Sequence, residues 1–181
     1  MKRMQLRYNV ATALMAAALC VAAPMAVPLG PVPITLATLA VYLTAGLLGP
    51  WRSAAAVGLY LAIGGVGVPV FAGFSGGLQH LLGPTGGFLF GYLLCALLAG
   101  ALCRRCPPVL VPLWLIGGAA VLYAVGCIWY GWQTDTPTRT AVAVCALPNL
   151  PGEMVKIAVA SGLILSLRGK INRLLTADVK Q

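Results

Sequence analysis

The sequence predicts an all-α integral membrane protein with six transmembrane helices and both termini in the cytoplasm. Three observations predict this class: the composition, a series of apolar stretches, and the distribution of basic residues. Of the 181 residues, 60% are hydrophobic and 8% are charged, and the mean hydropathy is +0.94. Soluble domains are roughly half apolar and a quarter charged. Because a spanning helix takes about 20 residues, we expect residues 1–181 to form a single transmembrane domain with about six spans and no soluble catalytic domain.

The first five predicted spans are the apolar stretches between charged residues and turn signals. They run approximately over residues 10–27, 34–48, 54–68, 88–102 and 109–130. The second and third stretches are short for a span, so we expect them to borrow flanking residues.

The first predicted span carries small residues at helical spacing. Ala13 and Ala17 form a small-xxx-small pair, and Ala18 and Ala22 form a second, offset pair. Such pairs let another helix approach closely in lipid, either within this protein or in a partner. The basic start and apolar core of residues 1–24 also resemble a secretory signal, but removing this span leaves five helices and spoils the charge distribution described below.

A glycine-rich segment, residues 64–92, joins the third and fourth spans. It holds ten glycines and two prolines in 29 residues. A tight helical hairpin needs only about 2 to 8 connecting residues. The length and glycine content of this segment therefore favour a role as a lid or pocket wall over that of a simple connection. Phe71, Phe74 and Phe88 offer apolar faces, and Gln79 and His80 are its best directional hydrogen-bonding side chains.

The last apolar stretch, residues 141–167, is too long for one simple span. Pro148 and Pro151 interrupt it, and proline discourages helix before it. We therefore expect a re-entrant or loop-like approach over residues 141–150 and a final helix from about Pro151, with Asn149 as a candidate cap.

Glu153 and Lys156 are charged residues inside that final span. A charge at the bilayer centre costs on the order of 3 kcal/mol, and such residues usually have a partner and face a cavity. At positions i and i+3 the two share one helical face, and Glu153 near the helix N-terminus is favoured by the helix dipole. The pair is either a structural ion pair or the anchor of a polar ligand, and the surrounding Pro-Gly and glycine-rich segments favour the anchor.

The basic residues set the predicted orientation. With a cytoplasmic N-terminus, one basic residue, Arg139, lies outside and Lys156 lies within the last span. The other ten of the twelve Lys and Arg residues lie inside: Lys2, Arg3, Arg7, Arg52, Arg104, Arg105, Arg168, Lys170, Arg173 and Lys180. This asymmetry follows the positive-inside rule. The net charge of +9 therefore indicates contact with anionic membrane lipid and not nucleic-acid binding.

The sequence offers little for catalysis or metal binding. The six cysteines are Cys20, Cys95, Cys103, Cys106, Cys127 and Cys145. Most lie in predicted spans, and the pair with C-x-x-C spacing at residues 103–106 lacks a second pair or a nearby histidine for a zinc site. The single histidine, His80, permits no Ser-His-Asp arrangement, and no phosphate-binding loop is present. We expect neither an enzyme nor a metal protein.

Four motifs then resemble one family in the same order along nearly the whole chain. They are GPVPITLATLAVYLTAGLLGP (residues 30–50), YLAIGGVGVPVFAGFSGG (60–77), GPTGGFLFGY (83–92) and PNLPGEMVK (148–156). Together they resemble the BioY family, the biotin-specific substrate-binding (S) components of energy-coupling-factor transporters. The resemblance implies an S-component-like bundle in the bacterial plasma (inner) membrane. It also implies no cofactor, capture of biotin as the transported ligand, and partnership with a transmembrane coupling component and cytoplasmic ATPase subunits.

The resemblance also implies roles for individual residues. Glu153 and Lys156 match the polar anchors for biotin, with Glu153 standing where the family pattern implies Asp. The carboxylate is suited to accept from the ureido N–H groups, and the ammonium to donate to the ureido carbonyl or to the ligand's carboxylate. The Ala13/Ala17 pair matches the surface used against the coupling component. Further candidate substrate contacts are Gln79, Phe71, Phe74, Tyr92 and Asn149.

Three other functions stay open from the sequence. An S component for another vitamin shares the fold and binds a different solute. A membrane-embedded enzyme has only Glu153, Lys156 and His80 available, and a scaffold predicts that Glu153 stabilises the fold and binds no ligand.

Overall fold

The structure is a computed structural model that describes residues 2–27, 32–105 and 107–176. Cys106 and Lys180 lie outside the described residues. The side chains of four other basic residues used to predict the orientation are also not described, namely those of Lys2, Arg3, Lys170 and Arg173.

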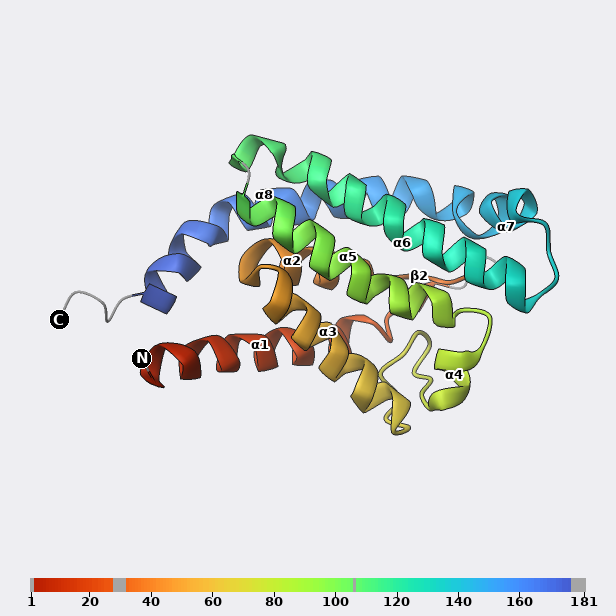
Figure 1. Cartoon of the computed structure of the whole chain (residues 1–181), viewed down its shortest axis with the longest axis horizontal. Coiled ribbons are helices and arrows are strands. Elements are labelled where there is room, and N and C mark those ends of the chain that lie inside the picture. The colour runs from red at the N-terminus through yellow and green to blue at the C-terminus, as the bar shows by residue number, and fades with distance from the viewer. Residues whose placement is uncertain (1, 28–31, 106, 177–181) are drawn as a thin grey trace.

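Long helices make up most of the described chain (Figure 1). In chain order they are α1 (Lys2–Ala22), α2 (Ala37–Leu48), α3 (Pro50–Gly65), α4 (Leu78–Leu82), α5 (Gly86–Arg105), α6 (Val111–Gln133), α7 (Thr138–Cys145) and α8 (Leu150–Thr176). Short 3₁₀ turns, η1 (Pro108–Leu110) and η2 (Leu147–Asn149), precede α6 and α8. The start of α1 and the end of α8 lie at one end of the molecule, and α4 and α7 lie at the other.

A small hairpin replaces helix at two places where the sequence predicted spans. Strands β1 (Ala26–Val27) and β2 (Ile34–Thr35) pair antiparallel, with Ala26 opposite Thr35 and Val27 opposite Ile34. Prolines at positions 24, 28, 31 and 33 explain the extended backbone, because each removes an amide donor and disfavours helix at the preceding residue. The first predicted span therefore ends early, and the second begins late.

Helix α2 lies at the centre of the bundle. It contacts α1, α3, α5 and α8, and ten of its twelve residues are buried. At a rise of 1.5 Å per residue, twelve residues extend only about 18 Å, less than the roughly 30 Å of a bilayer core. The expectation that this segment borrows flanking residues to complete a helical span is wrong, because the preceding residues form β2.

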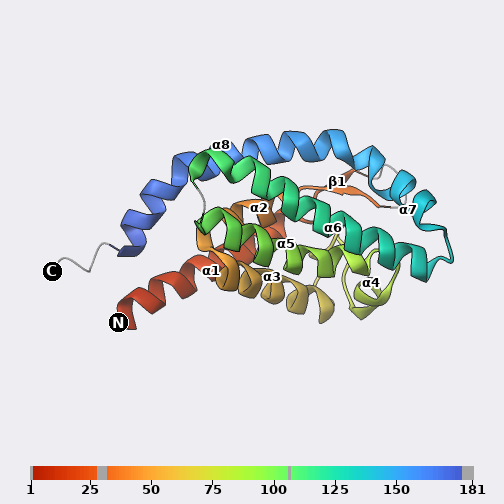
Figure 2. The same ribbon diagram turned by 45° about the horizontal axis from the view of Figure 1, so that its top comes forward.

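The approach to the last helix is also more regular than expected. Residues 138–145 form α7 instead of a loop, with Ala141 and Cys145 buried one turn apart on its inner face. The break expected at the prolines is the turn η2, and α8 begins at Leu150, close to the predicted start. Figure 2 shows α8 running along the outside of the bundle, with the hairpin beneath its first turns.

Three helical segments of the described chain are long and apolar enough to cross a membrane. They are Gly86–Arg105, Val111–Gln133 and Thr138–Gly169, the last combining α7 and α8. Helix α3 is shorter, at 16 residues, and α1 begins with basic residues. The count of six spans with both ends in the cytoplasm therefore stays a prediction, while the helical architecture is as expected.

Candidate functional site

Glu153 is the centre of a buried polar cluster near one end of the bundle. It lies in the first turn of α8, and 2% of its surface is exposed. The Tyr42 hydroxyl of α2 donates to Oε1 at 2.7 Å, and the Tyr123 hydroxyl of α6 donates to Oε2 at 3.0 Å. A buried carboxylate is costly unless donors satisfy it, so these two phenols make the position tenable. Three helices converge on one side chain.

Lys156 completes the cluster on the same face of α8. Its Nζ lies 3.3 Å from Glu153 Oε2 and donates at 3.0 Å to Thr38 Oγ1 in the first turn of α2. The i, i+3 ion pair predicted from the sequence is therefore present, and the side chain of Lys156 is buried. The pair offsets part of the desolvation cost of both charges.

These charges lie on the wall of a small inner chamber of about 30 Å³. Its polar wall comes from the starts of α2 and α8, from η2 and from α6. The lining residues are Val32, Pro33, Thr35, Thr38, Phe88, Tyr92, Leu122, Tyr123, Asn149, Glu153 and Lys156. Helix N-termini carry partial positive charge, so the starts of α2 and α8 favour an anionic group here.

A larger outer chamber of about 320 Å³ adjoins the inner one. The two share Val32, Pro33, Thr35, Phe88 and Tyr92. The remaining lining residues all come from the glycine-rich segment and are Phe71, Ala72, Ser75, His80, Thr85 and Leu89. The site is therefore bipolar, with a charged inner end and a mainly apolar outer end.

Phe71 forms a fixed part of the outer wall. Its ring is 2% exposed and meets the ring of Tyr60 edge-on at 5.6 Å and that of His80 at 6.4 Å. A Cβ at Gly64 on α3 would lie 2.2 Å from the Phe71 ring, so only glycine leaves room for it. The glycine-rich segment thus supplies a pocket wall, one of the two roles expected of it.

The structure brings five of the seven predicted substrate contacts together. Glu153, Lys156 and Asn149 line the inner chamber, Phe71 lines the outer chamber, and Tyr92 lines both.

The other two predicted contacts lie away from the chambers. Gln79 is exposed on α4, and Phe74 is 71% exposed with a left-handed backbone (φ 59°). Neither lines a chamber, and the neighbouring His80 does. The short helix α4 directs these two adjacent residues to different sides, so Gln79 stays a predicted contact that the chambers do not support.

Asn149 also differs from its predicted local role. Its Nδ2 donates to the Cys145 carbonyl at 2.7 Å, four residues back, instead of accepting from an amide of α8. It therefore links α7 to the turn before α8 and holds the inner wall in place.

Sequence analysis missed several polar residues of the inner chamber. Tyr42, Tyr123 and Thr38 each contact Glu153 or Lys156 directly. Their signal in the sequence is weak, because single tyrosines and threonines are ordinary residues of an apolar helix. A search for hydroxyl groups on the faces of predicted helices could have nominated them.

Ala13 and Ala17 lie on a different surface. Both are exposed on α1, whereas Ala16 and Leu19 on the same helix are buried. The small-residue pair therefore faces outward, away from the helices of this chain.

The described residues contain no group of three His, Cys, Asp or Glu side chains that could hold a metal ion. Within the same ranges Cys20, Cys95, Cys103, Cys127 and Cys145 are free thiols.

Comparison with known proteins gives one consistent result. A model described as the BioY family matches residues 1–173. The biotin transporter BioY of Thermotoga maritima is 35% identical over 167 residues, covering 90% of this chain and 96% of that protein. The biotin transporter BioY of Rhodobacter capsulatus is 40% identical over 155 residues, covering 77% of this chain and 80% of that protein.

The fold is similar to a solved structure. A crystal structure of the S-component for biotin from an ECF-type ABC transporter superposes with a TM-score of 0.85 at 25% identity, covering 93% of this chain and 94% of that chain. The S-component-like helical bundle predicted from the motifs is thereby confirmed.

Proposed function

The chain belongs to the BioY family, and on that premise we propose that it captures biotin in the two chambers as the membrane substrate-binding component of an energy-coupling-factor transporter. The bipolar site carries this proposal, because biotin is itself bipolar. It has a polar ureido ring at one end, an apolar thiophane ring and methylene chain beyond it, and a carboxylate at the far end of that chain. Residues 1–181 act as a single transmembrane substrate-binding domain, and binding takes place without chemistry on the ligand.

The hydrogen-bonding capacity left at the inner end matches a ureido group. A carboxylate accepts about four hydrogen bonds, and three positions on Glu153 are taken, by Tyr42, Tyr123 and Lys156. An ammonium has three donors, and Lys156 uses two of them. One acceptor position, on Glu153 Oε1, and one donor, on Lys156 Nζ, are left within the same cluster. An N–H next to a carbonyl, as in a ureido ring, is complementary to that pair.

We therefore assign the ureido carbonyl, and not the ligand's carboxylate, to Lys156. Lys156 lies at the inner end beside Glu153, whereas the polar outer residues His80, Ser75 and Thr85 lie at the end where the tail emerges. The apolar rings of Phe71 and Phe88 then cover the thiophane ring and the tail. Glu153 in place of Asp reaches both phenols.

The transport partners follow from the family. We propose a transmembrane coupling component and two cytoplasmic ATPases, with the exposed Ala13/Ala17 face of α1 against the coupling component. Small residues on a lipid-facing surface permit close helix contact. The protein would lie in the bacterial plasma membrane as a multi-pass protein. An S component for another vitamin is the alternative.

Equilibrium binding of radiolabelled biotin to the purified protein tests the proposal. We expect wild type to bind and Glu153→Gln and Lys156→Ala each to lose about 10- to 100-fold in affinity, since hydrogen bonds to charged groups contribute about 1.5–3 kcal/mol. Thr44→Val is the matched control. It changes a buried polar side chain of α2 that bonds only to the Ala40 carbonyl, and it should bind as wild type does.

Two results would contradict the proposal. Folded wild type that ignores biotin and binds another vitamin in a panel would move the assignment to that solute. Equal biotin binding by Glu153→Gln and wild type, with a lower melting temperature for the variant, would make the ion pair a structural element only.

A further inference from the structure

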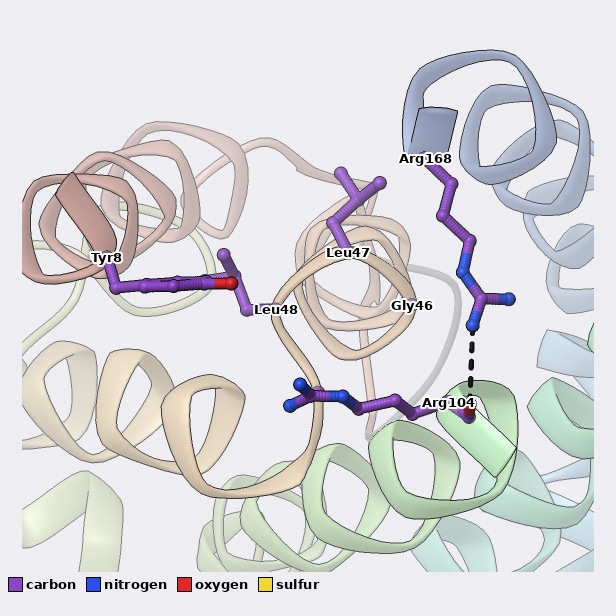
Figure 3. Close-up of a pocket in the computed structure, with 7 residues that line it drawn as sticks. Tyr8, Gly46, Leu47, Leu48, Arg104 and Arg168 are labelled. Carbon is purple, nitrogen blue, oxygen red and sulfur yellow. Dashed lines mark hydrogen bonds between the residues drawn. The ribbon is translucent and has the colours of Figure 1, made fainter. Parts of the chain in front are cut away.

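A second hollow, here called the arginine pocket, lies at the end of the bundle opposite α4 and α7. Its volume is about 250 Å³, and it surrounds the end of α2 (Figure 3). The lining residues are Tyr8, Gly46, Leu47, Leu48, Gly49, Arg104 and Arg168. It shares no lining residue with the two substrate chambers. The proposed binding of biotin therefore gives it no role.

Two guanidinium groups reach the arginine pocket without a carboxylate partner. Figure 3 shows Arg104 of α5 extending beneath the end of α2, and Arg168 of α8 approaching from the other side. Arg168 Nη2 donates to the Arg104 carbonyl at 3.4 Å. The acidic residues of the described chain are Asp135, just after α6, and Glu153, in the inner chamber. Neither forms an ion pair with Arg104 or Arg168, so the positive charge of the pocket is uncompensated within that part of the chain.

The turn at Gly49 leaves room for the side chain of Arg104. Gly49 joins α2 to α3 with φ of +78°, and a Cβ there would lie 3.1 Å from Arg104 Cδ and Nη1. The guanidinium therefore lies against bare backbone at this turn. A side chain at position 49 would crowd it, and the backbone conformation favours glycine.

Tyr8 adds a neutral donor to the same pocket. The Arg52 guanidinium lies 3.4 Å from the centre of the Tyr8 ring and fixes that ring by a cation–π contact. The Tyr8 hydroxyl points towards the end of α2 (Figure 3), and the described residues provide it with no hydrogen-bond partner. An anion in the pocket would meet a guanidinium and a hydroxyl donor together.

The depth of the arginine pocket matches the membrane surface. Arg104 and Arg105 end the apolar helix α5, and Trp51 at the start of α3 is 81% exposed. Basic residues at span ends and exposed tryptophans mark the level of lipid headgroups. Leu165, three residues before Arg168 on α8 and 46% exposed, offers apolar surface one turn deeper in the membrane.

We propose that the arginine pocket binds the phosphate of an anionic phospholipid from the cytoplasmic leaflet. Guanidinium groups pair well with phosphate oxygens, and basic pockets between transmembrane helices suit anionic headgroups. The adjoining apolar surface of α8 favours a lipid over free phosphate, because acyl chains can lie along it. This inference does not depend on which solute the substrate chambers bind.

Native mass spectrometry of the detergent-purified full chain, with added phosphatidylglycerol or phosphatidylcholine, tests the proposal. We expect wild type to retain one phosphatidylglycerol in preference to phosphatidylcholine. Arg104→Gln and Arg168→Gln should each reduce that retention by about five-fold or more. Arg105→Gln is the matched control, because it removes the same charge from the neighbouring exposed residue that does not line the pocket. It should change retention by less than about two-fold.

Tyr8→Phe and inorganic phosphate sharpen the test. Tyr8→Phe keeps the net charge, removes one donor, and should still weaken retention if the pocket is the site. Equal losses in Arg104→Gln and Arg105→Gln would overturn the proposal in favour of general surface charge. Equal retention of phosphatidylcholine would also overturn it. So would displacement of the lipid by inorganic phosphate at the same concentration, which would make the pocket a free-phosphate site. Melting temperatures in phosphatidylcholine alone check that each variant is folded.

Discussion

Glu153 accepts three hydrogen bonds from side chains of its own chain. The donors are Tyr42, Tyr123 and Lys156, and they come from three different helices. The carboxylate is therefore held in one position by its own chain, so under the proposed function little conformational entropy would be lost on binding biotin. The same arrangement makes the residue important for folding, because a buried charge without donors is strongly destabilising.

Removing the Tyr42 hydroxyl should affect both stability and binding. Tyr42→Phe deletes the 2.7 Å hydrogen bond to Oε1 and leaves a fully buried carboxylate oxygen short of a donor. We expect a loss of about 1–3 kcal/mol in stability, seen as a lower melting temperature, together with weaker biotin binding. Tyr123→Phe should cost less, because its hydrogen bond is longer, at 3.0 Å, and only partly buried.

The two variants also test how the carboxylate is held. If the phenols position Glu153, added biotin should raise the melting temperature of Tyr42→Phe by less than it raises that of wild type. Equal stabilisation by biotin in both proteins would show that Tyr42 only packs the core.

At this scale the sequence predicted the ion pair and missed its hydroxyl partners. Glu153 and Lys156 were identifiable because charge inside an apolar span is rare. Tyr42 was not, because its role depends on a contact with α8, far away in the chain. Gln79 and His80 were indistinguishable without knowing how α4 lies against the bundle.

Among the elements, α3 and the glycine-rich segment set the shape of the outer chamber. Gly64 lies beneath Phe71, and Phe71 in turn lies against Tyr60 of the same helix. The chamber wall is therefore supported by a rigid helix. The position of the Phe71 ring depends on the absence of a side chain at Gly64.

Gly64→Ala should displace Phe71 and disturb the outer chamber. The added methyl would lie 2.2 Å from the ring, so the ring or the helix must move. We expect a lower melting temperature, by overpacking of about 1–3 kcal/mol, and weaker biotin binding.

Gly58→Ala is the control on the same helix. A Cβ there meets nothing within 4 Å, so helix propensity should make this change neutral or slightly stabilising. If both variants behave alike, the contact between Gly64 and Phe71 does not support the chamber.

The sequence was less informative about elements than about the overall class. The prolines correctly predicted a break before α8, and α7 was missed because the prediction extended the helix-disfavouring effect of Pro148 and Pro151 over residues 141–150 as a whole. The hairpin β1–β2 was missed because its strands are two residues each and merge with the apolar stretches beside them.

For the whole molecule, composition and motif order predicted the bundle that the structure shows. The start of α1 and the end of α8 lie together, which fits an even number of crossings. The arginines at that end fit a cytoplasmic location. The sequence did not predict which helices are long enough to span a membrane. Helix α2 is short because the residues before it, which include Pro31 and Pro33, do not continue the helix.

Cysteine labelling tests the predicted orientation. Arg139→Cys should react with a membrane-impermeant maleimide in intact cells, and Arg105→Cys should react only after the membrane is permeabilised. Both positions are exposed, and the described native cysteines are buried or half-buried. Cys106 is replaced by Ser in both variants, so that the introduced cysteine reports its own position. Labelling of Arg105→Cys in intact cells would reverse the orientation and place the arginine pocket in the outer leaflet.

The inner chamber also bears on how long a ligand stays bound. Its volume of about 30 Å³ is less than a tenth of the 320 Å³ of the outer chamber, so we expect side chains of its wall to shift when a ureido ring enters. The same wall has to move again before the ring can leave. Residence time is then governed by the barrier to that movement as well as by affinity, and bound biotin should dissociate slowly even from a variant whose equilibrium binding is weakened.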